Sequence, residues 1–122
     1  MNEKKLNILV LDGGGSKGVY TIGVLKELEL RLGSPLYQHF GLIFGTSTGS
    51  IIAALIAIGY EIPKIEELYL TLIPNIMTKS SRKGRSKALK EEANKIFGSL
   101  KFDAFKLKLK TMAKLMLLMV CL

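Results

Sequence analysis

Ser47 lies in a stretch, Gly45–Gly49, that reads Gly-Thr-Ser-Thr-Gly. This G-x-S-x-G pattern is typical of a nucleophile elbow, a strained strand-to-helix turn that lifts a serine hydroxyl out of a sheet to attack an acyl carbonyl. Side chains at Gly45 and Gly49 would collide with neighbouring backbone, which explains the two glycines. The pattern therefore makes Ser47 the candidate nucleophile.

A second glycine-rich stretch, Asp12–Gly18, reads Asp-Gly-Gly-Gly-Ser-Lys-Gly and follows an apolar run. It fits the motif G-x-G-x-x-G, with Gly13, Gly15 and Gly18 at the glycine positions. Successive backbone N–H groups in such a turn, at the start of a helix, can stabilise the oxyanion that forms when a serine attacks a carbonyl. If both stretches follow parallel strands, they lie at the same carboxyl edge of the sheet.

Three other functions of the glycine-rich stretch are disfavoured. A dinucleotide-binding loop needs an acidic residue about 20 positions later, and the segment Pro35–Phe40 has none. A P-loop has its lysine after the last glycine, whereas Lys17 precedes Gly18. The phosphate loop of actin-like sugar kinases is followed by a β-hairpin, whereas a helical pattern follows here.

The elements that carry the two motifs alternate between strand and helix. The sequence predicts a buried parallel strand over Leu6–Leu11 and a second strand over about Leu42–Phe44. The first is followed by an amphipathic helix that ends at Gly33-Ser34-Pro35, the second by an apolar helix that Gly59 ends. The apolar face of the amphipathic helix consists of Val19, Ile22, Leu25, Leu28 and Leu32. This βαβα order predicts an α/β fold with a parallel sheet.

The second half of the chain has weaker patterns. A helix should begin at Pro63, bury Ile65, Leu68, Tyr69 and Leu72, and stop at Pro74. We expect a basic, serine-rich mobile loop over 78–86 and then a helix that ends at Gly98. Strict alternation predicts an edge strand over 105–110, and residues 111–122 are assigned to no element.

Charge is concentrated in the second half. The chain has a net charge of +8. The segment from Lys79 to Lys114 contains twelve Lys or Arg residues and three acidic residues. Two interpretations stay open: a solvated basic face, or a surface that attracts anionic lipid headgroups. No signal peptide and no run of about 20 apolar residues is present. We therefore expect no transmembrane span, and a cytoplasmic protein with peripheral membrane association.

The two motifs together, Leu11–Gly18 and Gly45–Ala54, resemble the patatin-like phospholipase family. The resemblance is strongest over 6–59 and suggests a partial domain over 6–122. It implies a three-layer α/β/α sandwich and an activity that hydrolyses acyl esters of lipids at a membrane surface. We expect no cofactor, no metal and no nucleic-acid partner. Ser47 would be the nucleophile and the Gly13–Gly15 backbone the oxyanion hole, while Lys17 would order the loop or bind phosphate.

One part of the family pattern is missing. The family uses a Ser–Asp dyad whose aspartate lies in a later D-G-G or D-G-A motif, and the 122 residues contain neither. Asp12 is expected to fix the glycine turn, Asp103 to be a surface or capping residue, and His39 to be structural. We therefore expect a truncated, weakly active or inactive lipid acyl hydrolase. The alternative is a non-catalytic remnant that binds lipid or another anion.

Overall fold

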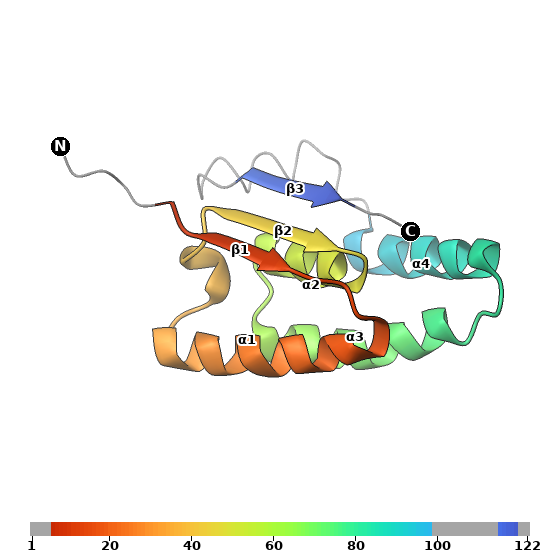
Figure 1. Cartoon of the computed structure of the whole chain (residues 1–122), viewed down its shortest axis with the longest axis horizontal. Helices are drawn as coiled ribbons and strands as arrows, with labels where there is room; N and C mark the ends of the chain where they lie inside the picture. Colours follow the sequence, from red (N-terminus) through yellow and green to blue (C-terminus); the bar gives the residue numbers. More distant parts are fainter. Residues whose placement is uncertain (1–5, 99–114, 120–122) are drawn as a thin grey trace.

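The computed structural model describes residues 6–98 and 115–119, which form an α/β fold (Figure 1). A three-stranded parallel sheet has the order β1-β2-β3, with β1 at Ile8–Leu11, β2 at Leu42–Thr46 and β3 at Leu115–Met119. The helices are α1 (Gly18–Leu32), α2 (Thr48–Ala57), α3 (Ile62–Met77) and α4 (Arg82–Phe97), with short 3₁₀ turns η1 (Gly15–Lys17) and η2 (Leu36–Gln38). The predicted strand–helix–strand order and parallel sheet are confirmed.

Helix α2 lies at the centre of the fold. Its sequence is almost entirely apolar after the first turn, and eight of its residues are buried: Thr48, Gly49, Ser50, Ile52, Ala53, Ala54, Leu55 and Ile56. It contacts all three strands on one side, and α1 and α3 on the other. A helix that is hydrophobic on every face needs such a position.

Helices α1 and α3 pack side by side beneath the sheet (Figure 1). Ile22 and Leu25 of α1 and Ile65 and Tyr69 of α3 are buried in the common core. Helix α1 ends as predicted, because Gly33 adopts a left-handed conformation with φ 68° and donates its N–H to the carbonyls of Glu29 and Leu30. The predicted apolar face is narrower than expected, since Val19 and Leu32 are exposed.

Strand β1 differs from the prediction of a strand buried on both faces. Leu11 is 4% exposed, whereas Ile8 is 49% and Val10 is 68% exposed. Within residues 6–98 and 115–119 the strand lies at the edge of the sheet, with the helices packed on the face of Leu9 and Leu11. A continuous apolar run indicates a strand but does not reveal how many of its faces are covered.

Two predicted boundaries in the second half are wrong. Helix α3 continues through Pro74 to Met77; Pro74 is exposed, so the helix carbonyl that loses its N–H partner can be hydrated. The predicted loop 78–86 is shorter than expected, because α4 already begins at Arg82. Ser81 is its N-cap, and the Ser81 hydroxyl accepts the N–H of Gly84 at 3.0 Å.

The remaining predictions fall partly outside the described residues. Helix α4 ends at Gly98 as predicted, whereas the predicted edge strand 105–110 lies outside the described residues. Within the unassigned segment 111–122, the run Leu115–Met119 forms β3, paired with β2. In the described part of the chain, no helix is both long and apolar enough to span a membrane.

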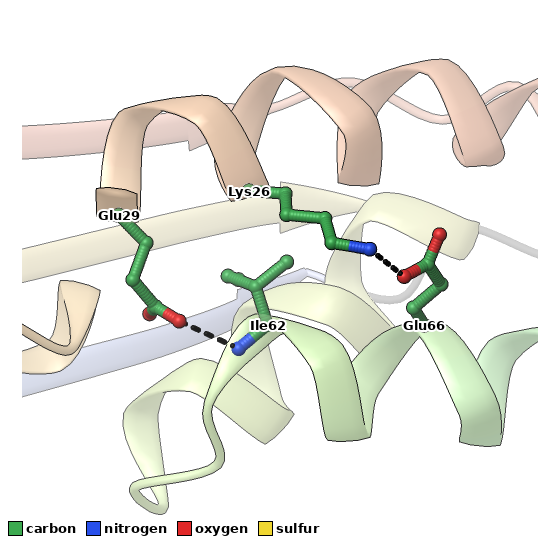
Figure 2. Close-up of polar contacts among 4 residues, drawn as sticks. All are labelled: Lys26, Glu29, Ile62 and Glu66. Carbon is green, nitrogen blue, oxygen red and sulfur yellow. Dashed lines mark hydrogen bonds and ion pairs between the residues drawn. The ribbon is translucent and has the colours of Figure 1, made fainter. Parts of the chain in front are cut away.

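Glu29 joins three elements at the end of α1, and Figure 2 shows its contact with Ile62. Its Oε1 accepts the N–H of Ile62 and its Oε2 accepts the N–H of Leu36, both at 3.0 Å. Ile62 is the first residue of α3, so the carboxylate satisfies an N–H that has no partner within the helix and lies at the positive end of the helix dipole. Nearby, Lys26 of α1 forms an ion pair with Glu66 of α3 at 2.6 Å.

We expect Glu29→Ala to lower the free energy of unfolding by about 1–3 kcal/mol, because two partly buried N–H groups lose their acceptor. Urea unfolding followed by circular dichroism measures this change. The matched control is Glu27→Ala on the same helix, whose ion pair with Arg31 is exposed; it should cost at most about 0.5 kcal/mol. Equal effects of the two substitutions would contradict the role of Glu29.

Candidate active site

The two glycine motifs lie at one edge of the sheet because β1 and β2 are parallel and in register. Leu11, the last residue of β1, pairs with Gly45 near the end of β2. The loop that starts at Asp12 and the turn at Ser47 therefore leave the sheet side by side, at the arrowhead ends of both strands (Figure 1). This arrangement is the one expected from the sequence.

Ser47 has the backbone conformation of a strained turn. Its φ is 53° and its ψ is −125°, and it is the only non-glycine residue with a positive φ among those that the structure describes. Such a conformation costs on the order of 1–3 kcal/mol and persists only when the surroundings impose it. Ser47 is also the N-cap of α2, and the buried Ser50 donates both its N–H and its hydroxyl to the Ser47 carbonyl. The backbone at Ser47 is therefore held in place by hydrogen bonds from the first turn of α2.

Gly45 and Gly49 are required by close backbone contacts. A Cβ on Gly45 would overlap the carbonyl of Gly49, and would lie 2.6 Å from the Cα of Ser50. A Cβ on Gly49 would lie 2.5 Å from the carbonyl oxygens of both Leu11 and Asp12. The end of β1, the turn and the start of α2 consequently pack with no space for side chains between them.

The glycine loop lies directly against the turn. A Cβ on Gly13 would be 2.8 Å from the Cβ of Ser47, 3.0 Å from the carbonyl oxygen of Thr46 and 3.5 Å from the Oγ of Ser47. Only glycine allows the backbone at this position to approach Ser47 so closely.

Two hydroxyl groups hold the loop in place. The N–H of Gly14 donates to the Oγ1 of Thr48 at 3.2 Å, and the hydroxyl of Tyr69 donates to the carbonyl of Gly15. Thr48 and Tyr69 thus hold two neighbouring residues of the loop from two different helices. Burial raises the pKa of Tyr69 above its ordinary value, against smaller opposing effects of Thr48 and the Gly18 backbone, so the phenol keeps its proton at neutral pH.

The N–H groups of the loop are not equivalent. That of Gly14 is bound by Thr48, whereas those of Gly13 and Gly15 have no acceptor among residues 6–98 and 115–119. A free N–H beside Ser47, near the N-terminus of α2, can stabilise a negative oxygen. Of the three predicted oxyanion donors, Gly13 and Gly15 are therefore the two whose N–H groups have no acceptor in the described part of the chain.

Of the other predicted residues of the glycine loop, two are exposed and one is buried against Tyr69. The side chains of Asp12 and Lys17 are exposed, and neither makes a hydrogen bond or ion pair within the described ranges. The turn is therefore held by Thr48 and Tyr69 rather than by the Asp12 carboxylate. Gly18 begins α1, where a Cβ would overlap the Tyr69 hydroxyl.

The one histidine of the chain, His39, lies apart from Ser47. His39 precedes β2, at the opposite end of the strand, and its Nε2 lies 2.7 Å from the hydroxyl of Ser34. Asp103 lies outside the described residues. In the part of the chain that the structure describes, the Ser47 hydroxyl has no hydrogen-bond partner and no cluster of His, Cys, Asp or Glu could hold a metal ion.

Sequence reasoning missed the site contributions of Thr48 and Tyr69. Tyr69 was predicted only as part of the apolar stripe of α3, where it is indeed 1% exposed. Its phenol is the one signal that was available, because a buried tyrosine hydroxyl usually has a hydrogen-bond partner. The pattern gave no indication of which partner that would be.

Comparison with known proteins identifies a family for this chain. The family model described as patatin-like phospholipase matches residues 9–116. The "cUMP-AMP-activated phospholipase" of Escherichia coli is 51% identical over 102 residues, which are 84% of this chain and 32% of that protein. "Phospholipase A I" of Arabidopsis thaliana is 47% identical over 62 residues, which are 51% of this chain and 5% of that protein.

A solved structure shares the fold. A chain in the crystal structure of full-length SpcU with full-length ExoU, from the type III secretion system of Pseudomonas aeruginosa, aligns with a TM-score of 0.50 at 23% identity. The alignment covers 88% of this chain and 22% of that one. The chain thus spans about a third or less of these three proteins. With the family model matched over most of its length, the chain belongs to the patatin-like phospholipase family.

Proposed function

We propose that this chain carries the nucleophile and the oxyanion loop of a lipid acyl hydrolase, a serine esterase of the phospholipase A type. The observation that carries the proposal is the conformation of Ser47, with φ 53° at the N-terminus of α2 and the Gly13 backbone in contact. A strained, otherwise unneeded conformation at a nucleophilic side chain is typical of active sites. Membership of a phospholipase family supports a lipid ester as the substrate.

The proposed chemistry is an acyl transfer. The Oγ of Ser47 attacks the ester carbonyl, the alcohol departs, and water later hydrolyses the acyl-enzyme. Negative charge forms on the carbonyl oxygen during attack, next to the N–H groups of Gly13 and Gly15. The dipole of α2, whose N-cap is Ser47, adds a partial positive charge at the same place.

We infer that these 122 residues alone are weakly active. They contain no D-G-G or D-G-A motif, and a general base typically contributes about 10²–10⁴-fold to the rate. We retain from the sequence the proposal of a cytoplasmic chain that meets its substrate at a membrane surface. A non-catalytic role in binding lipid or another anion is the second candidate, and it is favoured because the Ser47 hydroxyl has no hydrogen-bond partner among the described residues.

A fluorophosphonate ester tests the nucleophile even when turnover is slow, because it forms a stable bond with the attacking oxygen. We expect one adduct, located on Ser47 by peptide mapping, and none in Ser47→Ala. Ser50→Ala should still be labelled at Ser47, since the Ser50 hydroxyl is already hydrogen-bonded to a carbonyl. Labelling of Ser47→Ala at the wild-type rate would refute the assignment, and a total lack of labelling would favour the non-catalytic alternative.

Tyr69→Phe tests whether the Tyr69 hydroxyl positions the glycine loop. The substitution removes the hydroxyl that donates to the Gly15 carbonyl and keeps the buried ring. One such hydrogen bond is worth about 0.5–1.5 kcal/mol, so we expect labelling of Ser47 to slow by about 2- to 10-fold. The control is Tyr20→Phe, whose ring is 80% exposed and whose loss of a hydroxyl should change nothing. An unchanged labelling rate in Tyr69→Phe would show that the hydrogen bond from Tyr69 to Gly15 does not contribute to the reactivity of Ser47.

A further inference from the structure

Helix α4 presents basic side chains in a regular row. Lys83, Lys87 and Lys90 are spaced four and three residues apart, which places them on one face of the helix. All three are exposed, while Ala88 is 8% exposed on a different face. We call these three lysines the α4 stripe.

The charge of the α4 stripe is only weakly compensated. Lys87 lies 4.0 Å from Glu91, at the limit of an ion pair. Lys83 and Lys90 have no acidic partner in the part of the chain that the structure describes. By contrast, Arg31 and Lys64, which lie on α1 and α3, each form an ion pair at 2.7 Å. Most of the charge of the stripe is therefore available to an external anion.

A short segment connects the start of α4 to a residue that contacts the glycine loop. Helix α3 ends at Met77, whose Cε would be 2.9 Å from a Cβ on Gly15, and Met77 is 43% exposed. Only residues 78–81 separate Met77 from α4, so the start of α4 is at most about 18 Å from Met77. Figure 1 shows α4 on the side of the arrowheads of β1 and β2, the edge that carries Ser47.

We propose that the α4 stripe, together with the exposed Met77, docks this chain on a bilayer that contains anionic lipids. Lysines near an anionic membrane each contribute about 1 kcal/mol, or about fivefold in binding. The exposed apolar side chain of Met77, at the end of the preceding helix, suits the boundary between headgroups and acyl chains. The stripe contains no aromatic side chain for stacking on bases, which disfavours single-stranded nucleic acid as the occupant.

Docking on this surface deepens the proposed function, because it would bring the edge that carries Ser47 to the lipid. The binding itself needs no hydrolysis. Ser47→Ala should therefore bind vesicles as the wild-type chain does, so a failure of the proposed chemistry and a failure of docking give different results.

Flotation of the full chain with vesicles tests the proposal, since floating material is separated from aggregates. The vesicles contain either phosphatidylcholine alone or equal parts of phosphatidylcholine and phosphatidylglycerol. We expect flotation with the anionic vesicles only, decreasing as salt is raised. The double variant Lys83→Gln/Lys90→Gln should bind them about 30-fold more weakly, and its fold should be retained because Gln and Lys have similar helix propensities.

The matched control is Arg31→Gln/Lys64→Gln, which also changes the net charge from +8 to +6. It removes exposed charges from the last turn of α1 and the first turn of α3, and should bind like the wild type. Equal losses in both double variants would overturn the proposal, as would flotation that is the same with both vesicles. Tighter binding to a DNA duplex than to anionic vesicles, lost in Lys83→Gln/Lys90→Gln, would also overturn it.

Discussion

The close contact between the Gly13–Gly15 loop and the turn at Ser47 is the constraint on which the rest of the site depends. Three backbone segments meet there with no space for a Cβ: the end of β1, the turn itself, and the first turn of α2. This contact requires β1 and β2 to be parallel and in the observed register. It also requires α2 to lie against the sheet. The sequence of α2 favours this buried position, because the helix is apolar on every face.

Stability and reactivity are linked at this contact. The positive φ of Ser47 is unfavourable by itself, and burial of α2 in the core offsets it. Helix α3 is fixed to α1 by Glu29 at its first residue and reaches the glycine loop through Tyr69. The loop is therefore positioned by the packing of two helices as well as by its own sequence.

The sequence predicted those features that depend on short-range patterns. Glycines at fixed spacing around Ser47 and after the first apolar run were sufficient to expect both loops at one sheet edge, and the structure places them there. The α1 boundary at Gly33 followed from a single glycine in the left-handed region. These signals are local, and each has one steric explanation.

Features that depend on tertiary contacts could not be predicted in this way. The partner of the Tyr69 hydroxyl lies 54 residues away in sequence, and the exposure of Val10 depends on which faces of the sheet are covered. Pro74 indicated a helix end, but its exposed position lets α3 continue. For α4, the serine and glycine of the basic segment suggested a loop, whereas Ser81 acts as the helix cap.

The pairing of β2 with β3 also has a consequence for synthesis of the chain. Leu42 pairs with Leu115, 73 positions later, whereas the helices between them form from neighbouring residues. At the usual rate of translation, the edge of β2 waits about 4–15 s for its partner strand to be made. During that time, an apolar strand with unpaired backbone groups is open to other chains. Nascent chains that contain this segment should therefore depend on chaperones until β3 has been made.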